Sequence, residues 1–555
     1  MADTDLDYCV SEVEVLEVDD VLEGAEPGAA CNVDELLFAA DSFEDLTNEI
    51  VTDKLDGESS HKLQTIKTIT GDVEVDGTDK QHTYDTQKSE PASASTDDCD
   101  GTLPSETLCN GSSTTDEGSG ENELDEARIT RAQSVEETTR KDSVEEVDDP
   151  NWKLHKKHVF VLSEAGKPIY SRYGNEEKLV TMMGLMQAIV SFVQDANDNI
   201  RSIHAGDHKF VFLVRGPLIL VTVCSSQDSK AQLQLQLTYV YHQILSVLTF
   251  TQLTRIFEQR RNYDLRKHLS GTEKFIDNLW RLMSQDPSFL LQSVRCLPLP
   301  NTVRDTIGQS LQSAKDKELV FAILVVENQL VTMVRPKKFS LHPSDLHLIF
   351  NLVSGSTAWT YESWAPICLP RFDNSGYLYG HISYLTEECT ACLLLLSTDR
   401  NAFFNMSECK KKIMERLEKH KCIQPLCRAV KNNSYSIGQV GIQELWHFVY
   451  KSRSTAQFTS PKIGAPYTSD EEQERLFGLY LYLHHRIHSS SRPLKILCYS
   501  TKNEMVLGWV TSGFELYATF SPLTSKASAI HAVNKLLRWI KKEEDVLFII
   551  NSYTF

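Results

Sequence analysis

The chain has 555 residues, more than a single hydrophobic core of about 250–300 residues accommodates, so several domains are expected. Its net charge of −21 is unevenly distributed. Residues 1–150 hold 42 acidic against 9 basic residues, a balance of −33, and the other 405 hold 35 against 47, a balance of +12. This pattern predicts an acidic arm before a basic body that could favour an acidic partner, a phosphorylated head group or an anionic membrane surface.

The N-terminal stretch, the apolar runs and the cysteines argue against a secreted, membrane-spanning or disulfide-rich protein. The N-terminal stretch MADTDLDY has no basic region followed by an apolar run, so no signal peptide is expected. The longest dense apolar runs, such as Ala391–Leu396, are too short to cross a bilayer. Thirteen scattered cysteines lack the spacing of a disulfide framework and favour the reducing cytosol.

The arm, residues 1–150, is rich in Asp, Glu, Ser, Thr and Gly. Such a composition cannot bury enough apolar surface to offset the entropy of the chain, so we expect it to be disordered. Ser134 and Ser143 each begin a Ser-Val-Glu-Glu sequence with basic residues upstream, which makes both candidates for phosphorylation.

The globular region is predicted to begin with a hairpin, His158–Gly174. Its first strand is apolar at every position, whereas the second starts at Pro168 and mixes polar residues, as an edge strand does. The helix predicted at Glu177–Asp195 places Leu185 and Phe192 just beside its apolar stripe, where they either widen the core face or contact a partner. We therefore expect a partner interface at the open edge and on this helix, formed by Ile169, Tyr170, Arg172, Tyr173, Leu185 and Phe192.

The same order of elements, two strands, a helix, three strands and a helix, is predicted three times. The segment 251–318 is predicted to be helical and basic, and a last strand is predicted at Val546–Ile550. We expect an α/β (α+β) protein whose three domains each have a mainly antiparallel five-stranded sheet flanked by helices. The expected boundaries are 151–318 with the helical connector, 319–430 and 431–555.

No pattern of catalytic residues or cofactor-binding loop is present, so we expect neither catalytic residues nor a cofactor. Cys389, Cys392, Cys422 and Cys427 could suggest zinc, but their spacing and the leucine run after Cys392 favour ordinary thiols. His484 and His488, four residues apart on a helix, are expected to face solvent rather than a metal.

Basic residues gather at Lys153–Lys157, at Arg335, Lys337 and Lys338, and at Lys410–Lys412. Each cluster is either a solvated surface or part of a membrane-binding surface, since well-placed cations contribute about 1 kcal/mol each at an anionic membrane. Nucleic acid is not expected as a partner, because no aromatic residues alternate with these cations.

Five stretches together resemble the SAND/Mon family of vacuolar and lysosomal fusion proteins. They are His158–Gly174, Asn262–Arg266, Ala365–Phe372, Trp509–Tyr517 and Leu537–Asp545. The resemblance covers about residues 151–555 and implies three longin domains, in agreement with the repeated order of elements.

The resemblance also implies a function. Members pair with a Ccz-type longin subunit, and the pair is a guanine nucleotide exchange factor for the late-endosomal Rab GTPase. The early-endosomal Rab GTPase and phosphatidylinositol 3-phosphate recruit the complex from the cytoplasm to endosomal and lysosomal membranes. Because a fold does not fix a function, a longin adaptor or tether without exchange activity is the alternative, and an enzyme with a cryptic site is a further rival.

Overall fold

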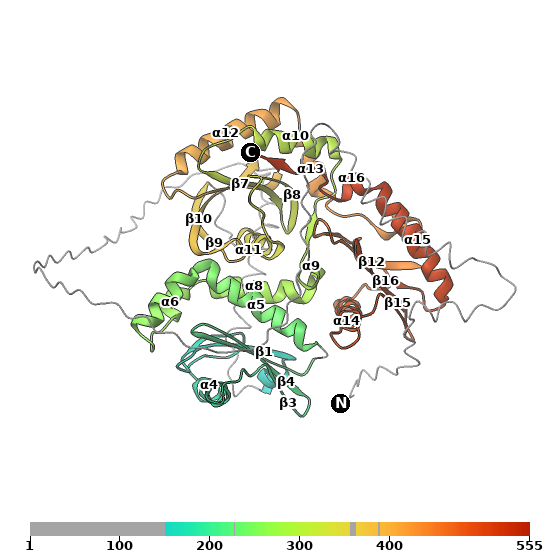
Figure 1. Cartoon of the computed structure of the whole chain (residues 1–555). Coiled ribbons are helices and arrows are strands. Elements are labelled where there is room, and N and C mark those ends of the chain that lie inside the picture. The colour runs from blue at the N-terminus through green and yellow to red at the C-terminus, as the bar shows by residue number, and fades with distance from the viewer. Residues whose placement is uncertain (1–149, 227, 356–361, 387–388) are drawn as a thin grey trace, which may run out of the picture. The chain divides into compact units, whose positions relative to one another are not determined.

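The computed structural model of the protein describes residues 150–555 apart from 227, 356–361 and 387–388 (Figure 1). The acidic arm, with Ser134 and Ser143, lies outside the described residues. The described chain begins with a short 3-10 helix, Pro150–Leu154, and continues into three domains with the same topology.

The first domain has a five-stranded antiparallel sheet in the order β2-β1-β5-β4-β3. Helix α4 connects β2 to β3, and α5 follows β5. The elements are β1 (Lys157–Ser163), β2 (Pro168–Ser171), α4 (Val180–Asp195), β3 (Ser202–Ala205), β4 (His208–Arg215), β5 (Leu218–Cys224) and α5 (Lys230–Val247).

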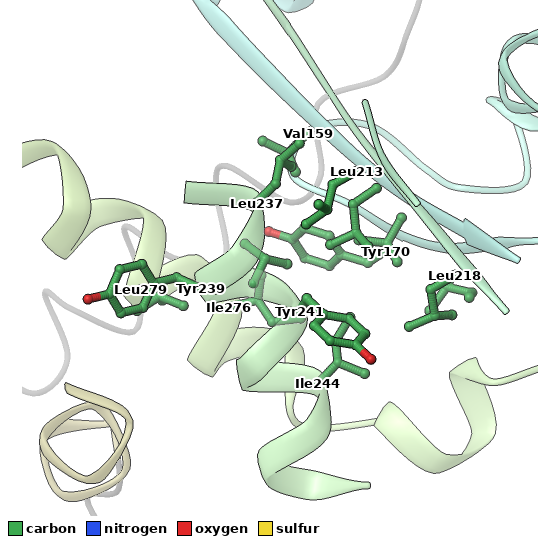
Figure 2. Close-up of a cluster of buried hydrophobic side chains, with 14 of the residues drawn as sticks. Val159, Tyr170, Leu213, Leu218, Leu237, Tyr239, Tyr241, Ile244, Ile276 and Leu279 are labelled. Carbon is green, nitrogen blue, oxygen red and sulfur yellow. The ribbon is translucent and has the colours of Figure 1, made fainter. Parts of the chain in front are cut away.

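Both faces of this sheet are covered, as the apolar sequence of β1 requires. Phe160 and Leu162 point into the core beneath α4, and Val159 and Val161 point into the core beneath α5. Figure 2 shows the core between α5 and the first sheet, to which Leu237 and Ile244 of α5 contribute. A capping box between Ser229 and Gln232 begins α5.

The second domain repeats the arrangement in the order β8-β7-β11-β10-β9. Its elements are β7 (Leu319–Val326), β8 (Gln329–Arg335), α11 (Pro343–Ser354), β9 (Ser363–Leu369), β10 (Asp373–Thr386), β11 (Cys389–Ser397), α12 (Phe403–Lys419) and α13 (Ile423–Lys431). Each residue of β7 is buried, because α11 packs on one face of the sheet and α12 on the other.

The third domain has the order β13-β12-β16-β15-β14. Its elements are a 3-10 helix (Ile437–Val440), β12 (Leu445–Ser452), β13 (Gln457–Thr459), α14 (Asp470–Ile487), β14 (Ile496–Ser500), β15 (Met505–Val510), β16 (Phe514–Phe520) and α15 (Lys526–Lys542). In each of the three domains, therefore, the second strand of the first hairpin (β2, β8 or β13) forms one edge of the five-stranded sheet.

The connector between the first two domains contains a strand that the sequence did not predict. Its helices are α6 (Phe250–Gln259), α7 (Arg266–Leu269), α8 (Glu273–Gln285), α9 (Pro287–Leu291) and α10 (Asn301–Gln312). Between α9 and α10, β6 (Val294–Cys296) pairs in parallel with both β8 and β13. The expectation of a wholly helical connector was therefore wrong, and the second and third sheets form one continuous 12-stranded sheet.

The strand predicted at Val546–Ile550 was also wrong. Helix α16 (Glu544–Leu547) occupies its start, and the last strand is β17 (Tyr553–Thr554), which pairs in parallel with β8. The run is apolar because Leu547 and Phe548 are buried in the core beneath α15, a burial that needs no strand.

Arg304 of α10 holds this C-terminal segment in place. Its buried guanidinium donates to the carbonyl oxygens of Leu297 (2.7 Å), Val546 (3.0 Å), Asp545 (3.0 Å) and Phe548 (2.8 Å). Further along α10, Tyr553 packs so closely on Gly308 that an added Cβ atom would lie 2.5 Å from its ring. The connector helix α10 and the end of the chain are thus joined by hydrogen bonds and by close packing.

Replacement of Arg304 by Met should loosen residues 544–555, because the new side chain fills space but donates no hydrogen bond. Hydrogen bonds to charged groups contribute about 1.5–3 kcal/mol each, so we expect the free energy of unfolding to fall by about 3 kcal/mol or more. Chemical denaturation and amide hydrogen exchange across 544–555 measure both effects. Arg538→Met is the matched control, because Arg538 is an exposed residue of α15. Equal behaviour of the two variants would contradict the role of Arg304.

Candidate partner-binding and membrane-binding surfaces

The edge of the first sheet at β2 differs from the corresponding edges of the other two sheets. In the second and third domains, β8 and β13 are each paired with β6. In the described part of the chain, β2 pairs with β1 alone. At the opposite edges, β3, β9 and β14 each pair on one side only within the described residues, so these edges do not distinguish the domains. The edge at β2, which the hairpin sequence predicted to be open, is therefore the edge whose counterparts in the other two domains are closed.

The side chains of this edge strand point into the protein. Ile169 and Tyr170 are buried, and the Tyr170 hydroxyl donates to Asp277 Oδ1 of α8 at 2.5 Å. Burial raises the pKa of Tyr170 well above its usual value and the Asp277 charge raises it further, so the hydroxyl keeps its proton. A partner that meets β2 would contact mainly its backbone.

The backbone of β2 is partly occupied already. The Ser171 N–H donates to Glu176 Oε1 at 3.1 Å, and the Arg172 N–H donates to Val159 O of β1 at 3.1 Å. An incoming strand would have to displace the Glu176 carboxylate. The Arg172 N–H, in contrast, is directed toward β1 and not toward the outer edge. Replacement of Arg172 by proline would remove this N–H and break the hydrogen bond to β1, so it would not test the outer edge alone.

Arg172 and Tyr173, which follow β2, pack against aromatic rings of the same chain. The Arg172 guanidinium lies 5.1 Å from the ring centre of Tyr173 and 5.6 Å from that of Trp280. His155 stacks on Tyr173 with 3.7 Å between ring centres. Both side chains are half-buried, so they border the open edge and contribute part of their surface to it.

The outer face of α4 is apolar. Leu185 is 62% exposed and Phe192 is 79% exposed, so the alternative that they widen the core face is wrong. They lie seven residues apart and share one face, with the exposed Ala188 between them. From Val180 to Gln194 the helix has no charged residue. This lack of charge could have identified the exposed apolar face from the sequence, but it was not used above. Exposed apolar faces of this kind often mark contact surfaces, so this face is a candidate for binding a partner.

The equivalent helices of the other domains lack such a face. The outer side of α11 is covered by helices of the first domain. There Asn351 Nδ2 donates to Gln243 Oε1 of α5 at 2.7 Å, and His347 Nδ1 lies 3.0 Å from the Tyr239 hydroxyl. The exposed side of α14 includes Asp470, Glu471 and Glu474. Among the three described helices at this position, α4 alone has an apolar and exposed outer face.

The basic residues after β8 lie at the surface. Lys337 and Lys338 are exposed, whereas Arg335 is half-buried and its guanidinium donates to Phe339 O in its own loop. The Lys338 ammonium also lies 4.6 Å from the centre of the Phe339 ring. The two lysines, rather than Arg335, can therefore approach an anionic surface.

Several cations of the other basic clusters are paired within the chain. Lys410 Nζ lies 2.9 Å from Glu362 Oε1, and Lys412 Nζ lies 2.8 Å from Glu408 Oε1. In the cluster before β1, Lys157 Nζ lies 2.9 Å from Asp228 Oδ2. These pairs reduce the positive charge available to a membrane, which favours Lys337 and Lys338. No helix among the described residues is long and apolar enough to cross a membrane.

The two metal hypotheses considered from the sequence have different outcomes. Cys392 is buried, and burial raises its pKa to about 12, so its thiol resists the deprotonation that zinc binding needs. His484, expected to face solvent, is instead half-buried beside His488 and Glu515. No sequence pattern pointed to Glu515, because it lies on β16 and only the fold brings it to α14.

Three protein families match the chain, in the same order as the three domains. The family described as "First Longin domain of FUZ, MON1 and HPS1" matches residues 157–279. The second longin domain of the same proteins matches residues 317–415, and the third matches residues 444–544. These ranges include most of the strands of the three sheets described above.

Individual relatives are similar over most of the chain. The vacuolar fusion protein MON1 homolog A of Gallus gallus is 52% identical over 442 residues, which cover 78% of this chain and 80% of that protein. The homolog A of Homo sapiens is 55% identical over 405 residues, covering 73% of this chain and 62% of that protein. Protein SAND of Takifugu rubripes is 51% identical over 447 residues, covering 79% and 86%.

Proposed function

Because the chain belongs to the MON1/SAND family of vacuolar fusion proteins, we propose that it is one subunit of a heterodimeric guanine nucleotide exchange factor. Its partner is a Ccz-type longin subunit, and its substrate is the late-endosomal Rab GTPase. The early-endosomal Rab GTPase and membranes with phosphatidylinositol 3-phosphate recruit the complex to endosomes and lysosomes during endosome maturation and fusion.

The observation that carries this proposal is a pair of surfaces on the first domain, the edge at β2 and the outer face of α4, that no other described strand or helix covers. The edge at β2 offers backbone groups to a strand, and the α4 face, formed by Leu185, Ala188 and Phe192, offers apolar surface. Addition of a strand to an open sheet edge is a common mode of recognition, and apolar helix faces supply the hydrophobic contact. The corresponding edges of the other domains are closed by β6.

Exchange needs no catalytic side chain in this protein. A surface that binds the GTPase more tightly without nucleotide than with it shifts the GTPase toward nucleotide release. Two longin domains side by side would offer such a surface, and one of them alone would offer part of it. The alternative function, a trafficking adaptor or tether, would use the same surfaces to bind a GTPase without discriminating between its states.

Measurement of GDP release separates the two functions. The purified complex with the Ccz-type subunit should accelerate release of fluorescent GDP from the late-endosomal Rab, and this chain alone should give little acceleration. A complex that binds the GTPase but leaves the release rate unchanged would favour the adaptor or tether. Full activity of the isolated chain would contradict a shared surface.

Charge placed on the α4 face should separate the two subunits. In the double variant Leu185→Asp/Phe192→Asp, association would bury two carboxylates and lose the apolar contacts. Each large side chain contributes about 1.5–3 kcal/mol when buried, so affinity should fall at least about tenfold. Titration of one labelled subunit with the other measures the change. Leu523→Asp, at a 93% exposed position of the third domain, should leave the affinity unchanged; an equal loss in both would contradict this interface.

Charge reversal at Lys337 and Lys338 should weaken membrane binding. Each lysine contributes about 1 kcal/mol at an anionic surface, and removal of the charge together with repulsion predicts at least a tenfold loss for the double Glu variant. Sedimentation with liposomes that contain phosphatidylinositol 3-phosphate measures binding. The double Arg variant keeps the charge and should bind as the wild type does. Binding that neither the Glu variant nor added salt weakens would contradict an electrostatic role.

A further inference from the structure

Three side chains of the third domain meet where α14 ends. His484 and His488 lie one turn apart in the last turn and C-cap of α14, with 4.4 Å between their ring centres. Glu515 projects toward them from β16, and His488 Nε2 lies 3.4 Å from Glu515 Oε2. One possible ligand atom from each residue lies within 4.8 Å of the other two. Among the described residues, these three form the one group of this kind.

The separations fit a metal ion of ordinary size. Zinc bonds to histidine nitrogen and to carboxylate oxygen at about 2.0–2.2 Å, which places tetrahedral ligand atoms about 3.4 Å apart. The His488–Glu515 distance of 3.4 Å already has this value. The third ligand atom lies within 4.8 Å of the other two, so it has to move by roughly 2 Å or less, a shift within the reach of side-chain torsions.

The composition of the group also suits a cation. Two imidazole rings and one carboxylate meet at the end of α14, and each of the three side chains offers a ligand atom. The C-terminal end of α14 adds partial negative charge from its last carbonyl groups.

We propose that His484, His488 and Glu515 form a zinc-binding site that joins the end of α14 to β16. Two imidazoles and one carboxylate are a donor set that zinc accepts, with water in the fourth position. The His488 side chain is 37% exposed, so the site has access to solvent, and the buried Glu515 anchors it in the sheet. The inference does not depend on exchange activity.

Two cations limit the affinity of this site. Lys451 Nζ lies 3.0 Å from Glu515 Oε1, and Arg453 Nε lies 3.7 Å from the same oxygen. Both approach Oε1, whereas His488 and the Tyr517 hydroxyl approach Oε2, at 3.4 Å and 3.5 Å. The metal therefore binds at Oε2 while the lysine keeps Oε1, and mutual repulsion between the two cations weakens binding.

Occupancy would stiffen a helix that also contacts the first domain. Gln232 Nε2 of α5 donates to Leu481 O of α14 at 2.8 Å. Lys156, before β1, lies 3.6 Å from Glu474 at the other end of α14. Because the last turn of α14 is held to β16 by the metal, its exchange with solvent slows when zinc is bound.

The test uses the full chain without a histidine tag, since a tag would itself bind zinc. Zinc affinity is measured by competition with a chromophoric chelator, and cobalt(II) is used as a spectroscopic probe for a tetrahedral site. His488→Ala should bind at least about 100-fold more weakly, beyond the 10–100-fold typical of residues that only support a ligand. His485→Ala removes an exposed histidine of the same helix, outside the group of three, and should bind as the wild type does.

A second variant tests the site in the opposite direction. Lys451→Met removes the competing cation, so it should bind zinc more tightly than the wild type, and it stays informative if His488→Ala folds poorly. Zinc should also slow amide exchange at the end of α14 in the wild type but not in His488→Ala. Equal affinity of the wild type and His488→Ala, or equal losses in the His485 and His488 variants, would overturn the site. Unchanged or weaker binding by a folded Lys451→Met variant would overturn the use of Glu515.

Discussion

The three-residue strand β6 is the element on which the arrangement of the second and third domains depends. Arg295 of β6 stands opposite Gln329 of β8 on one side and Phe458 of β13 on the other. The Val294 N–H donates to Ala456 O at 2.9 Å, and the Leu297 N–H donates to Leu330 O at 2.9 Å. Two sheets that would otherwise present open edges to solvent therefore satisfy each other's backbone through one short strand.

The side chains of β6 extend this connection to the end of the chain. The Arg295 guanidinium lies 5.2 Å from the ring centre of Phe458. Gln457 beside it exchanges hydrogen bonds with the backbone of Ile549, at 3.0 Å and 2.8 Å. Since Arg304 holds the neighbouring carbonyls, the connector, the third sheet and the C-terminal segment form one hydrogen-bonded unit. The first domain has no equivalent strand among the described residues, and its edge at β2 stays available.

Features that depend on residues close together in the sequence could be predicted, whereas features that depend on residues far apart in the sequence could not. Local patterns sufficed for the order of strands and helices in each of the three domains and for the edge position of β2. A strand of three residues shows no period of its own, so β6 could not be distinguished from its helical surroundings. The run Val546–Ile550 failed for the opposite reason, because a short apolar run is equally compatible with a strand and with any other buried segment. Glu515 meets His484 through the packing of α14 on the sheet that contains β16, which is a long-range contact.

The three helices that follow the hairpins show how one position in a fold can serve different ends. Asn351 and His347 of α11 use polar groups to bind helices of the first domain, so that side of the second domain is closed. The exposed side of α14 is charged, as a surface in contact with water should be. The outer face of α4 keeps Leu185 and Phe192 in water, at a cost in solubility that covering by another protein would remove.

Neighbouring positions on α4 support the same conclusion. Thr181, Gly184 and Ala188 lie near the exposed Leu185 on α4. Apart from the helix itself, no described atom lies within 4 Å of the Cβ position of Gly184. Small residues let a partner approach the helix closely, while Leu185 and Phe192 on either side supply the area that is buried. A face of this composition suits a packed helix or sheet better than a flexible peptide, because it offers shape and hydrophobic area but few hydrogen bonds. This is the character expected of a lasting subunit interface, in contrast with the more polar surfaces at which GTPases are bound and released.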